Sequence, residues 1–340
     1  MFESEAAEIP ALLARQAERL PQQLEEPVAR LDRLAPALIA TIARGSSDNA
    51  AAFAGYVAAL NLRLPTASVP PSIASVYGRT LRMESAVALA ISQSGAGVDL
   101  ALAARAARAG GAFTLGLINE PDSALGREVD FEIQIGAGTE HAVAATKTFM
   151  LSVTAALYLV ALWSRDESLR SALTELPGVL DRCRSVDWLC AMSTLAGCEQ
   201  VFVVARGAAL PVAAELALKL QEVPGLLADA QSAAELLHGP IAMASRDMPA
   251  IVLAGDRHSR ESVRGAMARL HAAGAPVLLL SPGSEPEYGA QVIRVPEAGH
   301  ELLQPLVSLF AMYPALAQLA RQRGRDPDRP PHLEKSTRTR

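Results

Sequence analysis

The residues with the clearest chemical potential lie at helical spacing within the segment AAELALKLQE. Glu215, Lys219 and Glu222 are separated by four and then three residues, so a helix would place them on one face. A carboxylate beside an amine can share proton-transfer work, because each group alters the pKa of the other. The other positions of this helix are apolar nearly all round, so we expect a buried helix whose polar stripe lines a cavity. The alternative is an ion pair on a solvated face.

A histidine follows this helix along the chain. His238 precedes Gly239 and Pro240, and such a pair is typical of a rigid turn. An imidazole held by a stiff turn can act as a general acid or base near neutral pH. The alternative is a loop histidine without a catalytic role.

Serine-rich turns follow two predicted strands. The sequence SQSG at 92–95 comes after an apolar run, and RGSS at 44–47 comes after another. Helix N-termini at the carboxyl ends of parallel strands present N–H groups that suit a phosphate, and serine hydroxyls would add donors. The alternative is that the serines only cap helices. The chain has no GxGxxG motif, which disfavours a dinucleotide.

A third turn, at 138–149, opens the longest apolar segment. It contains Glu140, Thr146 and Lys147, which either contribute to a site or form a capping box and a surface ion pair. The apolar segment runs over 149–163, contains Ser and Thr, and is too short to span a bilayer. We therefore expect a buried helix.

The elements that must position these residues alternate along the chain. Leu, Ala, Arg and Glu recur at helical spacing over roughly the first thirty residues. Strands are then predicted over 37–43, 85–91 and 112–118, with a helix over 98–110. Strands that alternate with helices indicate the α/β class, with a parallel sheet flanked by helices.

The second half of the chain repeats the first. The segments that begin at Ala205, Ile251 and Gly274 match, in order, those that begin at Ala43, Val87 and Gly111. Three matches at nearly one offset indicate a duplicated α/β domain.

These patterns predict four parts of the chain. We expect a helical segment over 1–30, domains over 31–170 and 185–322, and a tail over 323–340. The connection over 164–187 is charged and is expected to be irregular.

Composition excludes several classes of protein. The 340 residues are 50% apolar and carry a net charge of −5 without a basic stripe, so we expect no nucleic-acid partner. The segment MFESEAAEIP lacks the features of a signal peptide, and no membrane association is expected. Three cysteines and six histidines show no disulfide or metal-binding pattern. We expect a cytoplasmic protein without a metal or other cofactor.

The motifs occur together, in this order, in a known family. They are RGSS at 44–47, SQSG at 92–95, TEHAVAATK at 139–147, ELALKLQEV at 215–223, AAELLHGP at 233–240 and HLEKST at 332–337. Over nearly its whole length the chain resembles the sugar isomerase (SIS) domain pair of glucosamine-6-phosphate synthase. It is more similar still to the stand-alone SIS-type glucosamine-6-phosphate deaminases. The resemblance implies two tandem SIS domains, each flavodoxin-like and three-layered.

The resemblance also implies a role for each matched residue. Glu222 would be the base that moves a proton between C1 and C2, supported by Lys219 and Glu215. His238 would open the sugar ring, and Lys335 in the tail would contact the open-chain sugar at C1. Other matched residues would hold the phosphate or contact the sugar through backbone groups: Ser46, Ser47, Ser92, Gln93, Ser94, Val143 and Ala145.

The implied enzyme converts glucosamine 6-phosphate and water to fructose 6-phosphate and ammonia. Galactosamine 6-phosphate or a fructosamine phosphate would suit the same scaffold. A non-catalytic sugar-phosphate sensor is a further alternative, against which the complete set of acid–base residues argues. The family pattern also implies a homodimer with shared active sites, in which His238 reaches the neighbouring subunit's site.

The chain departs from the family pattern at three places. Gly97 stands where the synthase often has a phosphate-binding threonine, so phosphate binding is expected to depend more on backbone groups. Ala145 replaces a serine. The chain begins MFESE, without the N-terminal cysteine of a glutaminase domain, so we expect that glutamine is not the ammonia source within this chain.

Removal of the tail separates its two possible roles. Deletion from Pro331 onward should cost activity far more than stability, because loss of a positioned acid–base group costs roughly 10²–10⁴-fold in rate. Ammonia release and a thermal melt measure the two effects. A truncated chain that fails to fold would show that the tail is structural.

Overall fold

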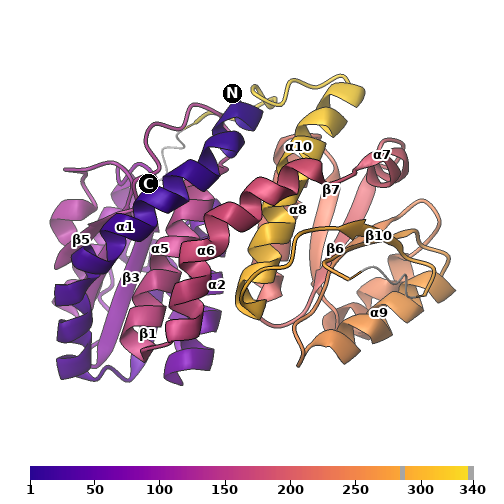
Figure 1. The fold of residues 1–340 in the computed structure, drawn as a ribbon. Helices are drawn as coiled ribbons and strands as arrows, with labels where there is room; N and C mark the ends of the chain where they lie inside the picture. The colour runs from indigo at the N-terminus through magenta and orange to yellow at the C-terminus, as the bar shows by residue number, and fades with distance from the viewer. Residues whose placement is uncertain (284–287, 336–340) are drawn as a thin grey trace. The chain divides into compact units, whose positions relative to one another are not determined.

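The computed structural model describes residues 1–283 and 288–335 and contains two parallel sheets in two compact units (Figure 1). The first unit comprises Ala11–Glu140, Ala145–Thr174 and the tail from Glu334. The second comprises Met1–Pro10, His141–Ala144 and Glu175–Leu333. Residues 336–340, the last of the predicted tail, lie outside the described residues.

The sheet of the first unit has five parallel strands in the order β2-β1-β3-β4-β5. The strands are β1 (Leu38–Ile42), β2 (Thr66–Ser68), β3 (Ala86–Ser92), β4 (Phe113–Ile118) and β5 (Phe131–Gln134). Its helices are most of α1 (Phe2–Leu34), α2 (Ser46–Leu62), α3 (Ser72–Ser75), α4 (Val98–Ala109), η1 (Gly126–Glu128) and α5 (Lys147–Ser164).

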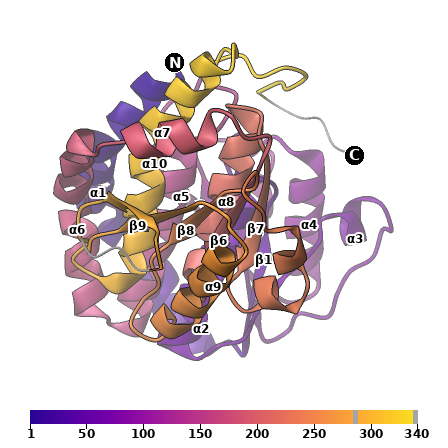
Figure 2. The same ribbon diagram turned by 90° about the vertical axis from the view of Figure 1, so that its right-hand side faces the viewer.

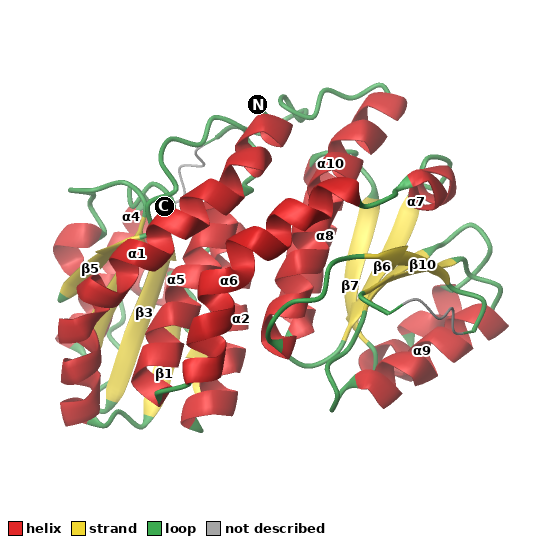
Figure 3. Cartoon of the chain, viewed as in Figure 1, coloured by secondary structure: helices red, strands yellow, loops and turns green. Residues whose placement is uncertain are grey.

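Helices cover both faces of this sheet (Figure 3). Strand β3 is buried along all seven residues, as expected for a central strand of a parallel sheet. On one face Ala86, Ala88 and Ala90 pack against α4, whose own contacting residues include Ala103 and Ala107. The small side chains let the helix approach the sheet closely. Helices α2 and α5, which pack against each other, cover the other face.

The sheet of the second unit has the order β7-β6-β8-β9-β10, also all parallel (Figure 2). The strands are β6 (Gln200–Ala205), β7 (Leu227–Ser232), β8 (Ala250–Leu253), β9 (Val277–Ser281) and β10 (Gln291–Arg294). The α-helices are α7 (Leu189–Leu195), α8 (Ala209–Glu222), α9 (Arg260–Ala272) and α10 (Gln304–Gln322). Short 3₁₀ turns are η2 (Arg182–Ser185), η3 (Glu235–His238), η4 (Pro240–Met243) and η5 (Glu301–Leu303).

The two sheets share one strand order. In each, the first strand lies between the second and the third, which is the flavodoxin-like arrangement. The three matching segment pairs of the sequence occupy equivalent places, at β1 and β6, β3 and β8, and β4 and β9. The predicted α/β class is confirmed.

Most predicted elements are confirmed, and one prediction is wrong. The helix near the N-terminus, the strands at β1, β3 and β4, and the helix at α4 are present. The segment 164–187 is not irregular, because helix α6 (Glu167–Asp181) occupies most of it. Leu169, Leu173, Leu176 and Leu180 recur at helical spacing and are buried, so the helix forms despite its internal proline.

Two helical segments are long and apolar enough to cross a membrane by length and composition. They are 147–164 and 301–322, and 83% of the most apolar 18-residue window in each is buried. The first is the apolar segment that the sequence predicts to be a buried helix, and this prediction is confirmed.

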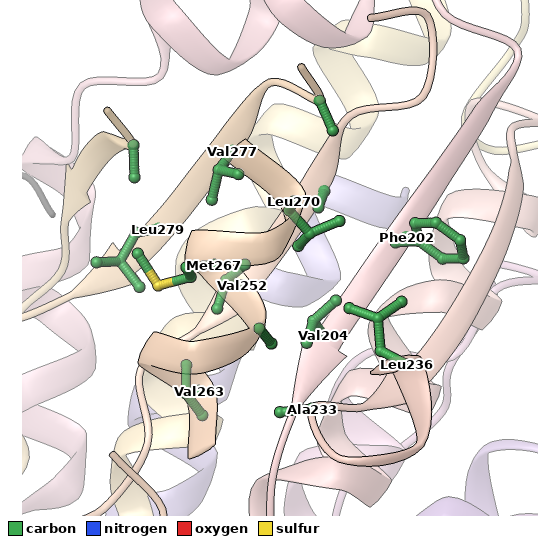
Figure 4. Packing of buried hydrophobic residues seen from close by; sticks show 14 of the residues in the cluster. Phe202, Val204, Ala233, Leu236, Val252, Val263, Met267, Leu270, Val277 and Leu279 are labelled. Carbon is green, nitrogen blue, oxygen red and sulfur yellow. The ribbon is translucent and has the colours of Figure 1, made fainter. Parts of the chain in front are cut away.

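Aromatic and aliphatic side chains fill the face of the second sheet that α9 covers (Figure 4). Phe202 on β6 is fully buried there. Phe202→Ala should lower the free energy of unfolding by about 3–5 kcal/mol, because it leaves a large cavity. Leu227→Ala on the paired strand β7 is the control, since Leu227 is 65% exposed. Urea unfolding, with amide exchange of β6–β9 as the probe, measures the free energy of unfolding of both variants. An equal loss in the two variants would contradict the assignment of this core.

Candidate functional site

Two turns of the first unit lie at the edge of the sheet where the strand order changes direction. Strands β1 and β3 are neighbours, with Ile42 opposite Ala90, and the turns 44–47 and 92–95 follow their carboxyl ends. Helix α4 packs on one face of the sheet and α2 on the other. The helix N-termini therefore diverge at a topological switch point, where open α/β sheets bind ligands.

Backbone hydrogen bonds fix the conformation of the turn at 92–95. The carbonyls of Ser92 and Gln93 accept from the N–H groups of Asn119 and Glu120, at 3.3 and 3.2 Å. The carbonyl of Gly95 accepts from the N–H of Leu125 at 2.9 Å. The turn after β3 is thus tied to the turn after β4, which preorganises it.

Gly95 is required by both conformation and space. Its φ of +57° lies in the left-handed region, and a Cβ there would be 2.1 Å from Oγ of Ser123. The serine hydroxyls complete the turn: Oγ of Ser92 accepts from the Gly95 N–H at 3.0 Å, and Oγ of Ser94 accepts from the Ala96 N–H at 3.3 Å.

The serines do not cap the two helices. The N-cap residues of α2 and α4 are Gly45 and Gly97, and neither helix has a side-chain cap. Ser46 and Ser47 instead lie within the first turn of α2 and are half-buried. The capping alternative is wrong for both helices. Gln93 and Ser94 are also half-buried, whereas Ser92 is buried.

An ion pair joins the two turns. Nε of Arg44 donates to the carboxylate of Asp99, which is 1% exposed in the first turn of α4. Sequence reasoning missed Asp99, although an acidic residue at the start of a helix is a recognisable signal. Burial also raises the pKa of Asp48 in the first turn of α2, and the charge of Arg44 opposes this only in part.

Glu140 is the most heavily bonded carboxylate of the first unit. Oε1 accepts from the N–H groups of Thr146 and Thr148, at 2.9 and 3.2 Å. Oε2 accepts from Oγ1 of Thr148 at 2.6 Å and from Nζ of Lys335 at 3.0 Å. Glu140 thus accepts from N–H groups at the start of α5, but the predicted capping box is absent, because the N-cap residue Thr146 makes no side-chain cap hydrogen bond. The predicted surface ion pair is wrong, because Glu140 is only 3% exposed.

The surroundings of Glu140 determine its ionisation. Burial alone would raise the pKa of this carboxyl group. The charge of Lys335 and the hydrogen bonds from Thr148 and Thr146 outweigh burial, and the pKa lies below the ordinary value of 4.5. Glu140 is therefore ionised throughout the neutral range.

The predicted sugar contacts Val143 and Ala145 are both half-buried. Val143 belongs to the second unit, where the carboxylate of Glu5 accepts from the N–H groups of His141 and Ala142 at 2.5 and 3.0 Å. Ala145 belongs to the first unit.

The charged stripe of the second unit lies on α8. Nζ of Lys219 is 3.5 Å from Oε1 of Glu215 and forms a close ion pair with Oε2 of Glu222. Lys219 and Glu215 are fully buried, so the solvated-face alternative is wrong for this pair. The side chain of Glu222 is 21% exposed.

The charges on α8 compensate one another. An isolated buried ammonium would be very costly, and two neighbouring carboxylates offset that cost. Lys219 also lies near the C-terminus of α8, where the helix dipole favours a cation. Glu222 is the exposed end of this set, and its carboxylate is held by Lys219, which Glu215 also contacts. His238 ends η3 in the same unit, and its side chain is exposed.

The second unit does not repeat the serine-rich turns. The turn after β6 has Ala208 and Ala209, and the turn after β8 has Gly255 and Asp256. These residues line a cavity of about 570 Å³ at the second switch point. Oδ1 of Asp256 accepts from the N–H groups of His258 and Ser259, at 2.9 and 2.7 Å. The carboxylate of Asp256 thus satisfies backbone N–H groups of its own turn, and this turn lacks the serines of the turns in the first unit.

No group of three or more His, Cys, Asp or Glu side chains that could hold a metal ion occurs within 1–283 and 288–335.

Comparisons with known proteins agree with this architecture. The SIS domain model matches residues 37–162 and 194–321. The glutamine–fructose-6-phosphate aminotransferases (isomerizing) of Pyrobaculum aerophilum and Thermus thermophilus are each 33% identical, over 91% and 87% of this chain. The chain spans about half of their length, 53% and 51%.

Two solved structures show the same fold. A provisionally assigned phosphosugar isomerase from Silicibacter pomeroyi DSS-3 has a TM-score of 0.91 and 35% identity, covering 96% of this chain and 99% of that one. A glucosamine-6-phosphate deaminase from Thermotoga maritima has a TM-score of 0.76 and 22% identity, covering 97% and 99%.

Substitution of Gly95 tests the turn as an anion site. Gly95→Ala should weaken binding of fructose 6-phosphate by roughly tenfold or more, because the Cβ strains a left-handed residue by about 1–2 kcal/mol and displaces Ser123. Calorimetric titration measures the affinity. Ser123→Gly in the same chain should restore part of it, and Gly265→Ala, where a Cβ meets open space, is the control. Unchanged binding in Gly95→Ala would show that the phosphate does not bind at this turn.

Proposed function

Because this chain belongs to the SIS domain family, we propose that it is a phosphosugar isomerase that acts on an amino sugar phosphate. The substrate we propose is glucosamine 6-phosphate, which with water gives fructose 6-phosphate and ammonia. The observation that carries the proposal is the charged set on α8, in which buried Lys219 pairs with both buried Glu215 and the partly exposed Glu222. An enzyme that moves a proton between neighbouring carbons needs such a base.

The proposed reaction begins with binding of the phosphate. The serine-rich turns of the first unit would hold it with hydroxyl and backbone donors: Ser46, Ser47, Ser92, Gln93 and Ser94. Backbone groups of Val143 and Ala145 would contact the sugar. His238 would then transfer the proton that opens the ring.

Glu222 carries out the central step. It would remove the proton from C2 and return it to C1, while C1 oxygen is protonated, so that the C2 amine becomes an imine. Water then adds to the imine, and ammonia leaves as the C2 ketone forms. Lys335 would contact the open-chain sugar at C1. Each positioned acid or base contributes roughly 10²–10⁴-fold to the rate, and none of these steps needs a redox cofactor.

A second candidate is the same chemistry in the direction of amination. It is favoured by the aminotransferase relatives, which are 33% identical over most of this chain. The two candidates share the base and the imine intermediate. The substrate of one is the product of the other, and they differ in whether ammonia is released or incorporated. Galactosamine 6-phosphate and fructosamine phosphates are the substrates to compare within the same assay.

We also propose a cytoplasmic homodimer whose active sites are shared, with the predicted domains over 31–170 and 185–322 as its two SIS modules. The state of two cysteines is compatible with a reducing compartment. Cys183 and Cys198 are buried free thiols, and burial raises the pKa of Cys183 to about 12. Sedimentation measures the assembly; a monomer with full activity would exclude shared sites.

The direct experiment is to incubate the protein with glucosamine 6-phosphate, without glutamine, and to measure both products. Equimolar ammonia and fructose 6-phosphate would establish deamination. Incubation of fructose 6-phosphate with ammonium tests the second candidate. No reaction in either direction, with a fold that sugar phosphates still stabilise in a thermal melt, would favour the sensor.

Replacement of the base separates chemistry from binding. Glu222→Gln should lower kcat by roughly 10²–10⁴-fold and leave the Kd for fructose 6-phosphate within a few-fold, because the amide keeps the shape but cannot accept the proton. Glu199→Gln is the matched control in the same unit, since Glu199 is an exposed carboxylate paired with Arg323. A near-normal kcat in Glu222→Gln would show that another group is the base.

A further inference from the structure

Lysine is rare in this chain and is confined to the candidate site motifs. The sequence has three lysines, Lys147, Lys219 and Lys335, against 28 arginines. Lys147 and Lys219 are 3% and 0% exposed, whereas the side chain of Lys335 is 30% exposed. Arginine provides nearly all other cations, although the two residues differ in chemistry: lysine is a compact point charge with a reactive amine. Lys335 is thus the lysine that a substrate can reach.

The position of Lys335 depends on a residue far away in the sequence. Residues 331–335 form no helix or strand, so no ladder of backbone hydrogen bonds holds this part of the tail. Nζ of Lys335 instead donates to Oε2 of Glu140, 195 residues away, at 3.0 Å. The contact lies within the first unit.

Glu140 is itself firmly held. Its two oxygens accept four hydrogen bonds, three of them from Thr146 and Thr148 at the start of α5 and the fourth from Lys335. A carboxylate offers about four acceptor sites, so its capacity is used. Because α5 is almost entirely buried, the carboxylate is as fixed as the helix that it caps. A charge 3% exposed also requires a cation, which Lys335 supplies.

We propose that Glu140 is a positioning residue of the proposed reaction: its buried carboxylate anchors the tail to the start of α5 and thereby presents the amine of Lys335 to the open-chain sugar. The inference rests on the proposed function for its catalytic consequence. The anchoring itself rests only on the contacts of Glu140.

The first test measures anchoring without any activity. Glu140→Gln keeps the size of the side chain and an oxygen acceptor but removes the charge. The whole protein is treated briefly with an amine-acylating ester, and modification of each lysine is followed by mass spectrometry. Lys335 should react several-fold faster in Glu140→Gln than in the unchanged chain. Glu128→Gln, which breaks the exposed ion pair with Arg105 in the same unit, should leave the rate unchanged.

The second test measures the catalytic consequence. Glu140→Gln should lower kcat for glucosamine 6-phosphate by on the order of 10²-fold, as expected for a misplaced catalytic group, with KM changed much less. In a Lys335→Ala background the same substitution should cost nothing further, because the residue through which it acts is absent. Equal losses in both backgrounds would show that Glu140 is only a helix cap.

The outcomes distinguish the two proposals. Unchanged acylation of Lys335 in Glu140→Gln overturns the anchoring, whatever the activity. Faster acylation in a protein that never deaminates any substrate overturns the proposed function and leaves the anchor in place. If Glu140→Gln does not fold, substitutions of Lys335 test the ion pair instead. Lys335→Met should then lower the melting temperature by several degrees, and Lys335→Arg, which keeps the charge, should not. Equal melting of both would overturn the anchor.

Discussion

The order in which the parallel strands are added determines where this protein can hold a ligand. In each sheet the chain first extends to one side of the first strand and then crosses to the other side. The helices that follow the first and third strands therefore lie on opposite faces, and their N-termini part at the carboxyl edge of the sheet. In the first unit, the serine-rich turns occupy this point. The hydrogen bonds to the turn after β4 and the ion pair of Arg44 with Asp99 fix the conformation of these turns.

Equivalent helices in the two units carry different polar residues. Helix α2 has Ser46 and Ser47 in its N-terminal turn. Helix α8 has alanine at that end and carries its charges toward the other, where Lys219 lies between two carboxylates. At the second switch point Asp256 binds the backbone N–H groups itself. The two units thus share a strand order and differ in the polar residues on equivalent elements.

Sequence periodicity predicted what is local. Alternating apolar runs indicated the strands, and the spacing of Glu215, Lys219 and Glu222 indicated a shared face, because both patterns follow from the geometry of a single element. The helix over 167–181 was missed, because its charges and proline obscured a regular leucine pattern. The pairs Arg44–Asp99 and Glu140–Lys335 span 55 and 195 residues. No spacing rule connects residues at such separations, since only the packed fold brings them together.

The lowered pKa of Glu140 determines the pH range over which its ion pair with Lys335 persists. A carboxyl group whose pKa is lower in the folded than in the unfolded chain contributes stability at pH values above the unfolded value, here 4.5, and this contribution is lost only as the pH falls toward the folded value. The pair with Lys335 therefore persists through neutral and mildly acidic conditions. Between pH 7 and the ordinary carboxyl range, protonation of Glu140 therefore does not release the tail.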